Sequence, residues 1–373
     1  MEREPLRKQA VEVASRFASR ATEVRQHLID HGEIHPELWS AFRERGWPGL
    51  LVAGNGGLAG MSLVLEAFAE QGMVLWLPVL SSAVAHAIDR QGPAPARRWL
   101  ESVAAGTAQL GVAATELETG HNLFGTRTEI RRDGDTFVVN GYKQVTSALD
   151  AVDRVLVHGR APEGYVTVLV DPRAAGATAT EVPMGHREGV RQFGLELRDV
   201  VVPAEDLVGE EGAGMLVLWS FANVERVLTA SVCLGTARYC IDAAAARART
   251  RTIAGDVPIG ARQAISHPLA RLHARHSAAR ALLLSTVAAF DAGDDGPSFA
   301  GNVNAVKVLA SELAFDAADH ALQVLGADAW DERAGWIDVY LDCAVVPLGP
   351  GEQRVRAQPP GRARAGAAGS AGR

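Results

Sequence analysis

The sequence predicts a mainly α-helical protein with a central β-domain, because three kinds of pattern follow one another along the chain. Residues 1–110 show the spacing of amphipathic helices, and residues 111–211 alternate apolar and polar side chains as strands do. Helical spacing returns at 212–356, in segments long enough for a four-helix bundle. We therefore expect an N-terminal helical domain, a β-barrel-like middle domain and a C-terminal four-helix bundle.

The N-terminal helices are predicted from their apolar periodicity and from the residues that end them. The segments MSLVLEAFAEQG and LSSAVAHAIDRQG each finish at glycine, a residue that commonly follows a helix C-terminus. The stretch AGNGGLAG at 53–60 is interpreted as a flexible turn between helices. It follows no predicted strand, so it is not interpreted as a dinucleotide-binding loop.

The middle zone is predicted to be a compact β-domain. The segment RTEIRRDGDTFVVNGYKQVTS alternates apolar and polar residues, and its Asp133-Gly134 and Asn140-Gly141 pairs are expected to form hairpin turns. Further strand-like segments bounded by Gly and Pro continue to residue 203. Together these segments predict about six to eight strands.

The C-terminal zone begins with an unusually long helical run, AGMLVLWSFANVERVLTASVCLGTARYCIDAAAARART. Roughly 37 residues of straight helix would span about 55 Å. A Gly- and Pro-containing loop and three further helical segments follow, which together make up the predicted bundle. The last residues, 357–373, are rich in Gly, Ala, Arg and Pro without periodicity, and they are predicted to be disordered.

Composition excludes several classes of protein. The chain of 373 residues has a net charge of −7 and no Lys/Arg-rich block, so we expect no nucleic-acid partner. The charged N-terminus lacks the apolar core of a signal peptide, and no segment has the ~18–20 uninterrupted apolar residues of a membrane span. The three cysteines, Cys233, Cys240 and Cys343, lie in apolar segments and are expected to be reduced. A cytoplasmic protein without a membrane anchor is therefore expected.

Two neighbouring histidines are not interpreted as a metal site. His273 and His276 lie three residues apart on a polar helix face, with no acidic third ligand at helical spacing. They are expected to be solvated surface residues, and no metal site is predicted.

One acidic residue lies on a stripe that otherwise faces a core. In FANVERVLTASVCLG, Glu225 shares its helical spacing with apolar residues and Thr229. Carboxylates are seldom buried without a partner or a chemical task, and Arg226 is a poor partner because adjacent helical residues diverge. The pattern leaves two interpretations open, namely an ion pair with another cation and a catalytic carboxylate.

Five blocks of sequence resemble the acyl-CoA dehydrogenase family, and they occur in the same order as in that family. They are ATELETGHN, DGDTFVVNGYKQVTS, LRDVVVPAEDLVGEEGAGM, RQAISHPLARL and ALQVLGADAW, within a match from about 35 to 355. The resemblance implies an FAD-dependent oxidoreductase that converts an acyl thioester to its α,β-enoyl form. In that chemistry a carboxylate removes the α-proton while the β-hydride moves to flavin N5.

The resemblance also implies which residues of the middle zone contact FAD. Thr115 and Glu116 match the Thr-Glu that opens the family's flavin-contacting loop, and Gly120 is retained from the motif that follows. Thr146 and Ser147 stand in the segment where the family has Trp-Ile-Thr beside the flavin. The altered end of the loop places His121 among the expected substrate contacts.

A second group of expected FAD contacts lies in the bundle. Arg251 and Gln263 match the Arg and Gln that reach the flavin nucleotide of a neighbouring subunit. Gln323 and Gly326 are retained from the family's Gln-x-x-Gly-Gly-x-Gly, in which Ala replaces two glycines here. The resemblance therefore implies a homodimer or homotetramer, or a mixed oligomer with a related subunit.

The catalytic base is expected to be Glu225. Most family members place a Glu before Gly-Thr near the C-terminus, where this chain has Pro350 followed by Gly351 and Glu352. A minority, resembling the isovaleryl and long-chain branches, take the base from the long bundle helix immediately before an Arg, which is the position of Glu225. Arg226 and Gly351 are then expected near the substrate, and Glu352 is a competing base.

Three functions remain open from the sequence. The first is dehydrogenation of a thioester of coenzyme A or of an acyl-carrier protein, with a flavoprotein or oxygen as electron acceptor. The second is a catalytically silent subunit that completes an active partner in a mixed oligomer. The third is a flavin monooxygenase on the same fold, which would need no thioester base.

Overall fold

The structure, a computed structural model, describes residues 3–52, 56–120, 122–185, 190–253, 255–294 and 297–348. The tail at 357–373 and the predicted site residues His121, Gly351 and Glu352 lie outside the described residues. Within them the chain forms helices, then a β-sheet, then long helices, as the sequence predicts. The division into domains at residues 110 and 211 stays a prediction.

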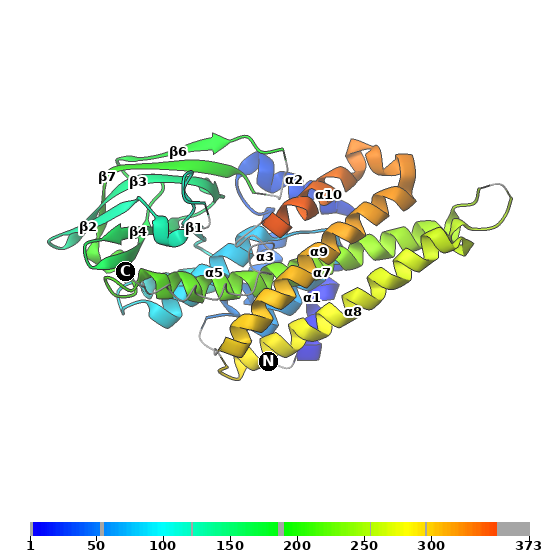
Figure 1. Ribbon diagram of the computed structural model, residues 1–373, viewed down its shortest axis with the longest axis horizontal. Helices are drawn as coiled ribbons and strands as arrows, with labels where there is room; N and C mark the ends of the chain where they lie inside the picture. Colours follow the sequence, from blue (N-terminus) through cyan, green and yellow to red (C-terminus); the bar gives the residue numbers. More distant parts are fainter. Residues whose placement is uncertain are drawn as a thin grey trace, which may run out of the picture.

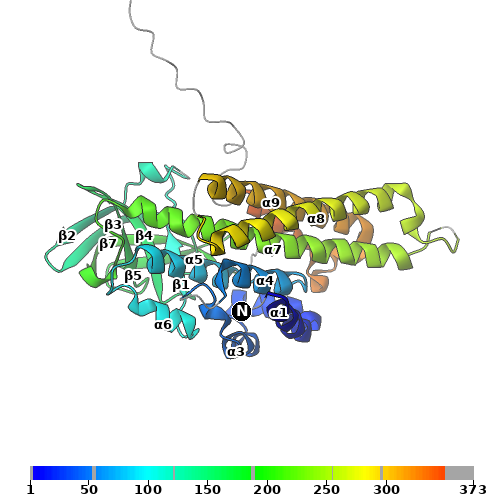
Figure 2. The same cartoon turned by 90° about the horizontal axis from the view of Figure 1, so that it is seen from below.

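The N-terminal region is helical and packs beneath the long bundle helices (Figure 2). Its described helices are α1 (Arg3–Phe17), α2 (Ala21–His31), α3 (Pro36–Glu44), α4 (Gly57–Ala69), α5 (Trp76–Gln91) and α6 (Arg98–Ala104). The prediction of a flexible turn at 53–60 is wrong for its second half, because α4 already begins at Gly57. The carboxylate of Asp291 accepts hydrogen bonds from the backbone N–H groups of Leu58 and Ala59, at 2.8 and 3.2 Å, and so supplies this helix start with an anionic cap.

Eight strands form one sheet in the order β6-β7-β3-β2-β4-β5-β8, with β1 added beside β4. The strands are β1 (Leu110–Ala113), β2 (Glu129–Asp133), β3 (Thr136–Ser147), β4 (Arg154–Ala161), β5 (Gly164–Val170), β6 (Ala177–Val182), β7 (Gln192–Pro203) and β8 (Leu207–Val208). The strands β2 and β4 pair at Glu129 and Arg160 alone, so the sheet is weakly joined there. Side chains from the strands on both sides of this weak pairing share one buried core, as in a barrel-like domain.

One of the two predicted hairpin turns is wrong. The Asp133-Gly134 pair does connect β2 to β3, but Asn140-Gly141 lies inside β3, at a bulge in its pairing with β7. The amide of Asn140 exchanges hydrogen bonds with Asp199 on β7, and a Cβ on Gly141 would come 2.5 Å from Thr128 Oγ1. The glycine is therefore explained by a close approach between strands rather than by a turn.

The C-terminal helices surround α7 (Gly214–Thr250), whose 37 residues agree with the predicted long helix. The other helices are α8 (Gln263–Asp291), α9 (Pro297–Leu325) and α10 (Trp336–Val345). Figure 1 shows α7 running from the β-domain to the opposite tip of the molecule, where the α7–α8 connection lies. Gly235 lets α7 cross α4 closely, because a Cβ there would lie 2.5 Å from the backbone oxygen of Glu66.

Among the described helices, α7 alone has the length and apolarity that could cross a membrane. Of its most apolar window, 67% is buried inside the protein, between the N-terminal helices and α8 and α9 (Figure 2). Its apolar composition is therefore accounted for by its position in the core.

Candidate active site

The end of strand β3 presents a buried hydroxyl. Thr146 is 2% exposed, and within the described part of the chain its Oγ1 has no hydrogen-bond partner. The neighbouring Ser147 donates its hydroxyl to Gln192 Oε1 at 3.0 Å. Val145 and Ala148, on either side of these residues, have positive φ angles of 56° and 57°. A buried polar atom beside a strained strand end is a feature of ligand sites, and it fits the edge of a bound cofactor.

The loop after β1 lies against this strand end. The backbone N–H of Gln144 donates to the carbonyl of Thr115 at 2.9 Å, and Glu116 and Gly120 form a β-bridge within the loop. Gly120 has a φ of 52°, and no other atom lies within 4 Å of the position its Cβ would take. Two apolar side chains of the loop, Leu117 and Phe124, are 71% and 59% exposed. The loop thus leaves an open, partly apolar surface beside β3, which suits a flat aromatic ligand.

The side chain of Glu116 points into the protein, and its carboxylate is heavily hydrogen-bonded. Donors come from Lys143 Nζ, from the Thr126 and Thr128 hydroxyls and from the backbone of residues 127 and 128. Burial opposes ionisation, but these donors outweigh it and lower the pKa of Glu116 to about 2. The Glu116 carboxylate therefore holds the loop, and its backbone is the part left to face a cofactor.

Glu225 is a buried carboxylate on α7. It is 5% exposed, and the hydroxyl of Thr229, one turn later, donates to its Oε1 at 2.9 Å. Arg226 is half-buried, and its Nη1 lies 3.5 Å from Asn223 Oδ1 on the same helix. An acidic group in a core environment, with one oxygen held by a hydroxyl, has the setting that a general base requires.

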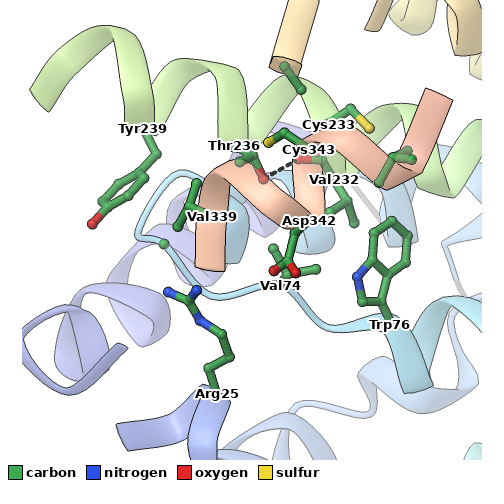
Figure 3. A pocket seen from close by; sticks show the side chains of 13 residues that line it. Arg25, Val74, Trp76, Val232, Cys233, Thr236, Tyr239, Val339, Asp342 and Cys343 are labelled. Atoms are coloured by element: carbon green, nitrogen blue, oxygen red, sulfur yellow. Dashed lines mark hydrogen bonds between the residues drawn. The ribbon is translucent and has the colours of Figure 1, made fainter. Parts of the chain in front are cut away.

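A small cavity lies along the same stripe of α7. Val232 and Thr236, which line it, follow Glu225 by seven and eleven residues, or about 10 and 16 Å along the helix. The remaining walls include Cys343 of α10, Val74 of the connection before α5, and Trp76 at the start of α5 (Figure 3). Its volume is about 20 Å³, enough for one small group.

The other expected cofactor residues gather at the far tip of the bundle. Arg251 ends α7, Gln263 begins α8, and Gln323 lies in the last turn of α9, followed by Gly326. All four residues are exposed, and an ion pair of 2.6 Å between Arg247 and Asp328 joins the end of α7 to the segment after α9. Gly326 has a φ of 67°, and apart from its chain neighbours no atom of the described residues lies within 4 Å of the position that a Cβ would take.

The structure therefore divides the expected cofactor residues into two clusters. One cluster surrounds β3 and the loop after β1, and the other lies at the opposite end of α7 (Figure 1). The helix α7, whose 37 residues span about 55 Å, runs from the β-domain to that tip. Within one chain the two clusters therefore lie at opposite ends of the long helix.

Sequence reasoning missed several residues that shape the site, and one histidine was misplaced. Lys143, His158 and Tyr165 come from three strands and contact the loop after β1, a set that no local pattern indicates. The expectation that His276 is solvated is wrong, since it is 5% exposed and its Nε2 lies 3.2 Å from the carbonyl of Leu234 on α7. His273 is exposed, as expected, and the described residues contain no group of three or more His, Cys, Asp or Glu side chains arranged for a metal ion.

Comparison with known proteins identifies the family. Residues 212–358 match the family described as acyl-CoA dehydrogenase, C-terminal domain. The acyl-CoA dehydrogenase FadE12 of Mycobacterium tuberculosis is 32% identical over 370 residues, covering 94% of this chain and 92% of that protein. The cyclohex-1-ene-1-carbonyl-CoA dehydrogenase of Syntrophus aciditrophicus is 31% identical over 232 residues, covering 60% of this chain and 55% of that protein.

Solved structures agree with this assignment. A probable acyl-CoA dehydrogenase from Mycobacterium abscessus superposes with a TM-score of 0.85 at 25% identity, covering 95% of this chain and 96% of that one. The butyryl-CoA dehydrogenase of Megasphaera elsdenii has the same fold, with a TM-score of 0.84, 21% identity and coverage of 94% and 96%. The chain belongs to the acyl-CoA dehydrogenase family, the FAD-dependent flavoproteins that oxidise CH–CH groups.

Proposed function

We propose that this protein catalyses α,β-dehydrogenation of an acyl thioester, with Glu225 as the base that takes the α-proton. The observation that carries the proposal is the buried carboxylate of Glu225 on α7, held at one oxygen by Thr229. The usual base position of the family is Pro350 in this chain, and proline has no group that accepts a proton. When bound, FAD supplies the acceptor for the hydride that leaves the β-carbon.

The chain's own residues have three tasks in this reaction. Glu225 receives the α-proton in a site from which water is largely excluded, and Thr229 keeps the carboxylate oriented. Thr115, Thr146 and Ser147 contact the flavin ring system along the loop and the end of β3. Arg251, Gln263, Gln323 and Gly326 of a second copy hold the nucleotide part, so the active form is a homodimer or a homotetramer.

The thioester carrier and the electron acceptor belong to the same proposal. The substrate is a thioester of coenzyme A or of an acyl-carrier protein, and the reduced flavin passes its electrons to a flavoprotein or to oxygen. The relatives are named for reactions on coenzyme A thioesters, which supports the first carrier. We place the reaction in the cytoplasm, as the reduced cysteines suggest.

The visible spectrum of the purified protein tests the proposal directly. We expect a yellow flavoprotein that bleaches anaerobically with a suitable acyl-CoA. Glu225→Gln should keep the bound flavin and abolish bleaching, because the amide cannot accept the proton. The matched control is Glu66→Gln, which alters another buried helical carboxylate, one that pairs with Arg280 at 2.6 Å. That variant should still bleach.

Other outcomes would favour the alternatives. A colourless protein that acquires flavin only when a related subunit is co-expressed would indicate a silent partner. Full turnover in Glu225→Gln would show that Glu225 is not the catalytic base. Oxygen-dependent product formation without thioester bleaching would indicate a monooxygenase.

A further inference from the structure

The most completely buried charge in the β-domain lies directly behind the loop after β1. Lys143 on β3 is 0% exposed, and its Nζ donates to three oxygens. These are the carbonyl of Ala114 at 3.3 Å, Oε1 of Glu116 at 2.7 Å and Oγ1 of Thr126 at 3.0 Å. One ammonium group thus contacts the start and the end of the loop at the same time.

Glu116 completes this connection from the loop side. Its carboxylate accepts from the hydroxyls of Thr126 and Thr128, at 2.5 and 2.7 Å, and from the backbone N–H groups of Arg127 and Thr128, at 2.7 and 3.0 Å. The chain therefore closes on itself between residues 116 and 128, and Lys143 attaches that closure to β3. Because β3 continues to Thr146 and Ser147, one buried ion pair joins both parts of the proposed flavin edge.

Two side chains from the neighbouring strands hold the middle of the loop. His158 Nε2 on β4 lies 3.2 Å from the carbonyl of Leu123, and the hydroxyl of Tyr165 on β5 donates to the carbonyl of Phe124 at 2.7 Å. The two rings stack on each other with their centroids 5.4 Å apart. Side chains from three strands, β3, β4 and β5, therefore hold the loop at its ends and at its centre.

The location of this network indicates a purpose beyond general stability. A buried ion pair contributes little net stability compared with apolar packing, but it imposes one geometry, because breaking it leaves a buried charge unsatisfied. The polar cluster lies behind the loop that carries the exposed Leu117 and Phe124, and strand β3 continues from Lys143 to the buried Thr146 hydroxyl. Binding is strengthened when the binding surface is already in its bound shape.

We infer that Lys143 and Glu116 are positioning residues that hold residues 115–128 and the end of β3 in the geometry that receives the flavin. This inference rests on the proposed function for its ligand, and on the hydrogen bonds of Lys143 and Glu116 for its geometry. Lys143 and Glu116 act through the loop, and neither side chain needs to touch the flavin or the substrate.

The test combines hydrogen exchange of the loop with flavin affinity. In Lys143→Met, we expect amide exchange of residues 117–125 to accelerate at least tenfold, and flavin to bind at least tenfold more weakly. Lys307→Met is the matched control, because Lys307 is also a buried lysine, at 2% exposure, that donates to a backbone carbonyl in the bundle. It should lower the unfolding midpoint without changing exchange in the loop.

A double variant separates geometry from charge. Lys143→Met with Glu116→Gln removes both charges while leaving acceptors for Thr126 and Thr128, so loop protection and flavin affinity should partly return. If Lys143→Met does not fold, Glu116→Gln is measured alone. It should also accelerate loop exchange and weaken flavin binding, but by smaller factors. Unchanged loop exchange and flavin affinity in folded variants would overturn the inference. A wild-type protein that binds no flavin would contradict the proposed function instead. The role of Lys143 in holding the loop would then still be tested by comparing loop exchange in Lys143→Met and in the wild type.

Discussion

The two ends of α7 carry opposite kinds of binding surface. At the β-domain end, the charged and polar groups are buried and bonded to one another, as in the Lys143–Glu116 pair. At the bundle tip, Arg251, Gln263 and Gln323 are exposed. The first surface is thus shaped within one chain, whereas the second is the part of the molecule that we propose as a half-site for a second copy.

The largest expected effect is on catalytic activity, when a Glu225→Gln chain and an Arg251→Glu chain are combined in one dimer. Glu225→Gln should reduce turnover by about 100- to 10,000-fold, the range for losing a general base. Arg251→Glu should prevent flavin binding at the partner's site. In a mixed dimer of these two chains, one site combines the intact Glu225 of one copy with the intact Arg251 of the other. Activity should therefore return after co-expression, as measured by flavin bleaching per mixed dimer.

The outcome separates the two arrangements of the site. If each flavin site were built within one chain, both sites of the mixed dimer would be defective, and no activity would return. Co-expression of two copies of the same variant is the control, and it should remain inactive.

Acidification should lower the stability of the folded protein through His158 at the β-domain end. Burial, aided by the charge of Lys143, lowers the pKa of His158 from 6.5 to about 4 in the folded protein. The unfolded chain therefore binds more protons between these values, so stability is unaffected above pH 6.5 and falls as the pH drops towards 4. A shift of that size corresponds to about 3 kcal/mol of lost stability.

Denaturant unfolding at pH 7 and pH 4.5 measures this effect. His158→Gln should reduce the loss on acidification, because glutamine does not titrate. His273→Gln changes an exposed histidine and should leave the pH dependence as it is in the wild type. Equal pH dependence in all three proteins would show that His158 does not link acid to the stability of this end. Burial also lowers the pKa of His86, to about 4, and the pKa values of His276 and His320, so these histidines contribute to the loss that remains in His158→Gln.

Removing one exposed arginine should weaken flavin binding without affecting the fold. Arg251→Ala deletes a charged donor, and hydrogen bonds to charged groups contribute about 1.5–3 kcal/mol, or roughly tenfold or more in affinity. Arg249→Ala, an exposed arginine two residues earlier on α7, is the matched control. Isothermal titration of FAD into the apoprotein should distinguish the two variants, while their unfolding midpoints stay equal. Equal affinities would argue against a half-site at the tip.

The sequence predicted the features that depend on local pattern, and it failed where a distant residue decides the structure. The long helix α7 and a β-domain of about six to eight strands were predicted from periodicity and spacing, and the structure has eight strands. The start of α4 was missed because its cap, Asp291, comes from α8. Asn140-Gly141 reads as a turn because its partners, Asp199 and Thr128, lie on other segments.

The same rule applies to the candidate site. The positions of Glu225, Thr146 and Arg251 were expected from the family resemblance, but their surroundings were not. Lys143 lies in a strand pattern that gives no hint of burial, and it is buried because Glu116 and Thr126 come from a loop 17 to 27 residues away. A single sequence does not reveal such cross-strand polar pairs, because the register that creates them is a property of the folded sheet.

The smallest expected effect tests whether the buried end of the site is prepared for a ligand. Thr146→Val replaces a buried hydroxyl, which has no hydrogen-bond partner in the described part of the chain, with a methyl group of similar shape. Losing an unsatisfied polar group should leave the apoprotein equally stable or slightly more stable. If the hydroxyl bonds to the flavin, affinity should fall by about 0.5–1.5 kcal/mol, a few-fold to tenfold, as measured by FAD titration. The two measurements together are informative. If Thr146 were purely structural, Thr146→Val would be less stable than the wild type and would bind flavin equally well. Thr286→Val is a suitable control, because that buried threonine in α8 donates to Leu282 O at 2.8 Å and should lose stability on substitution.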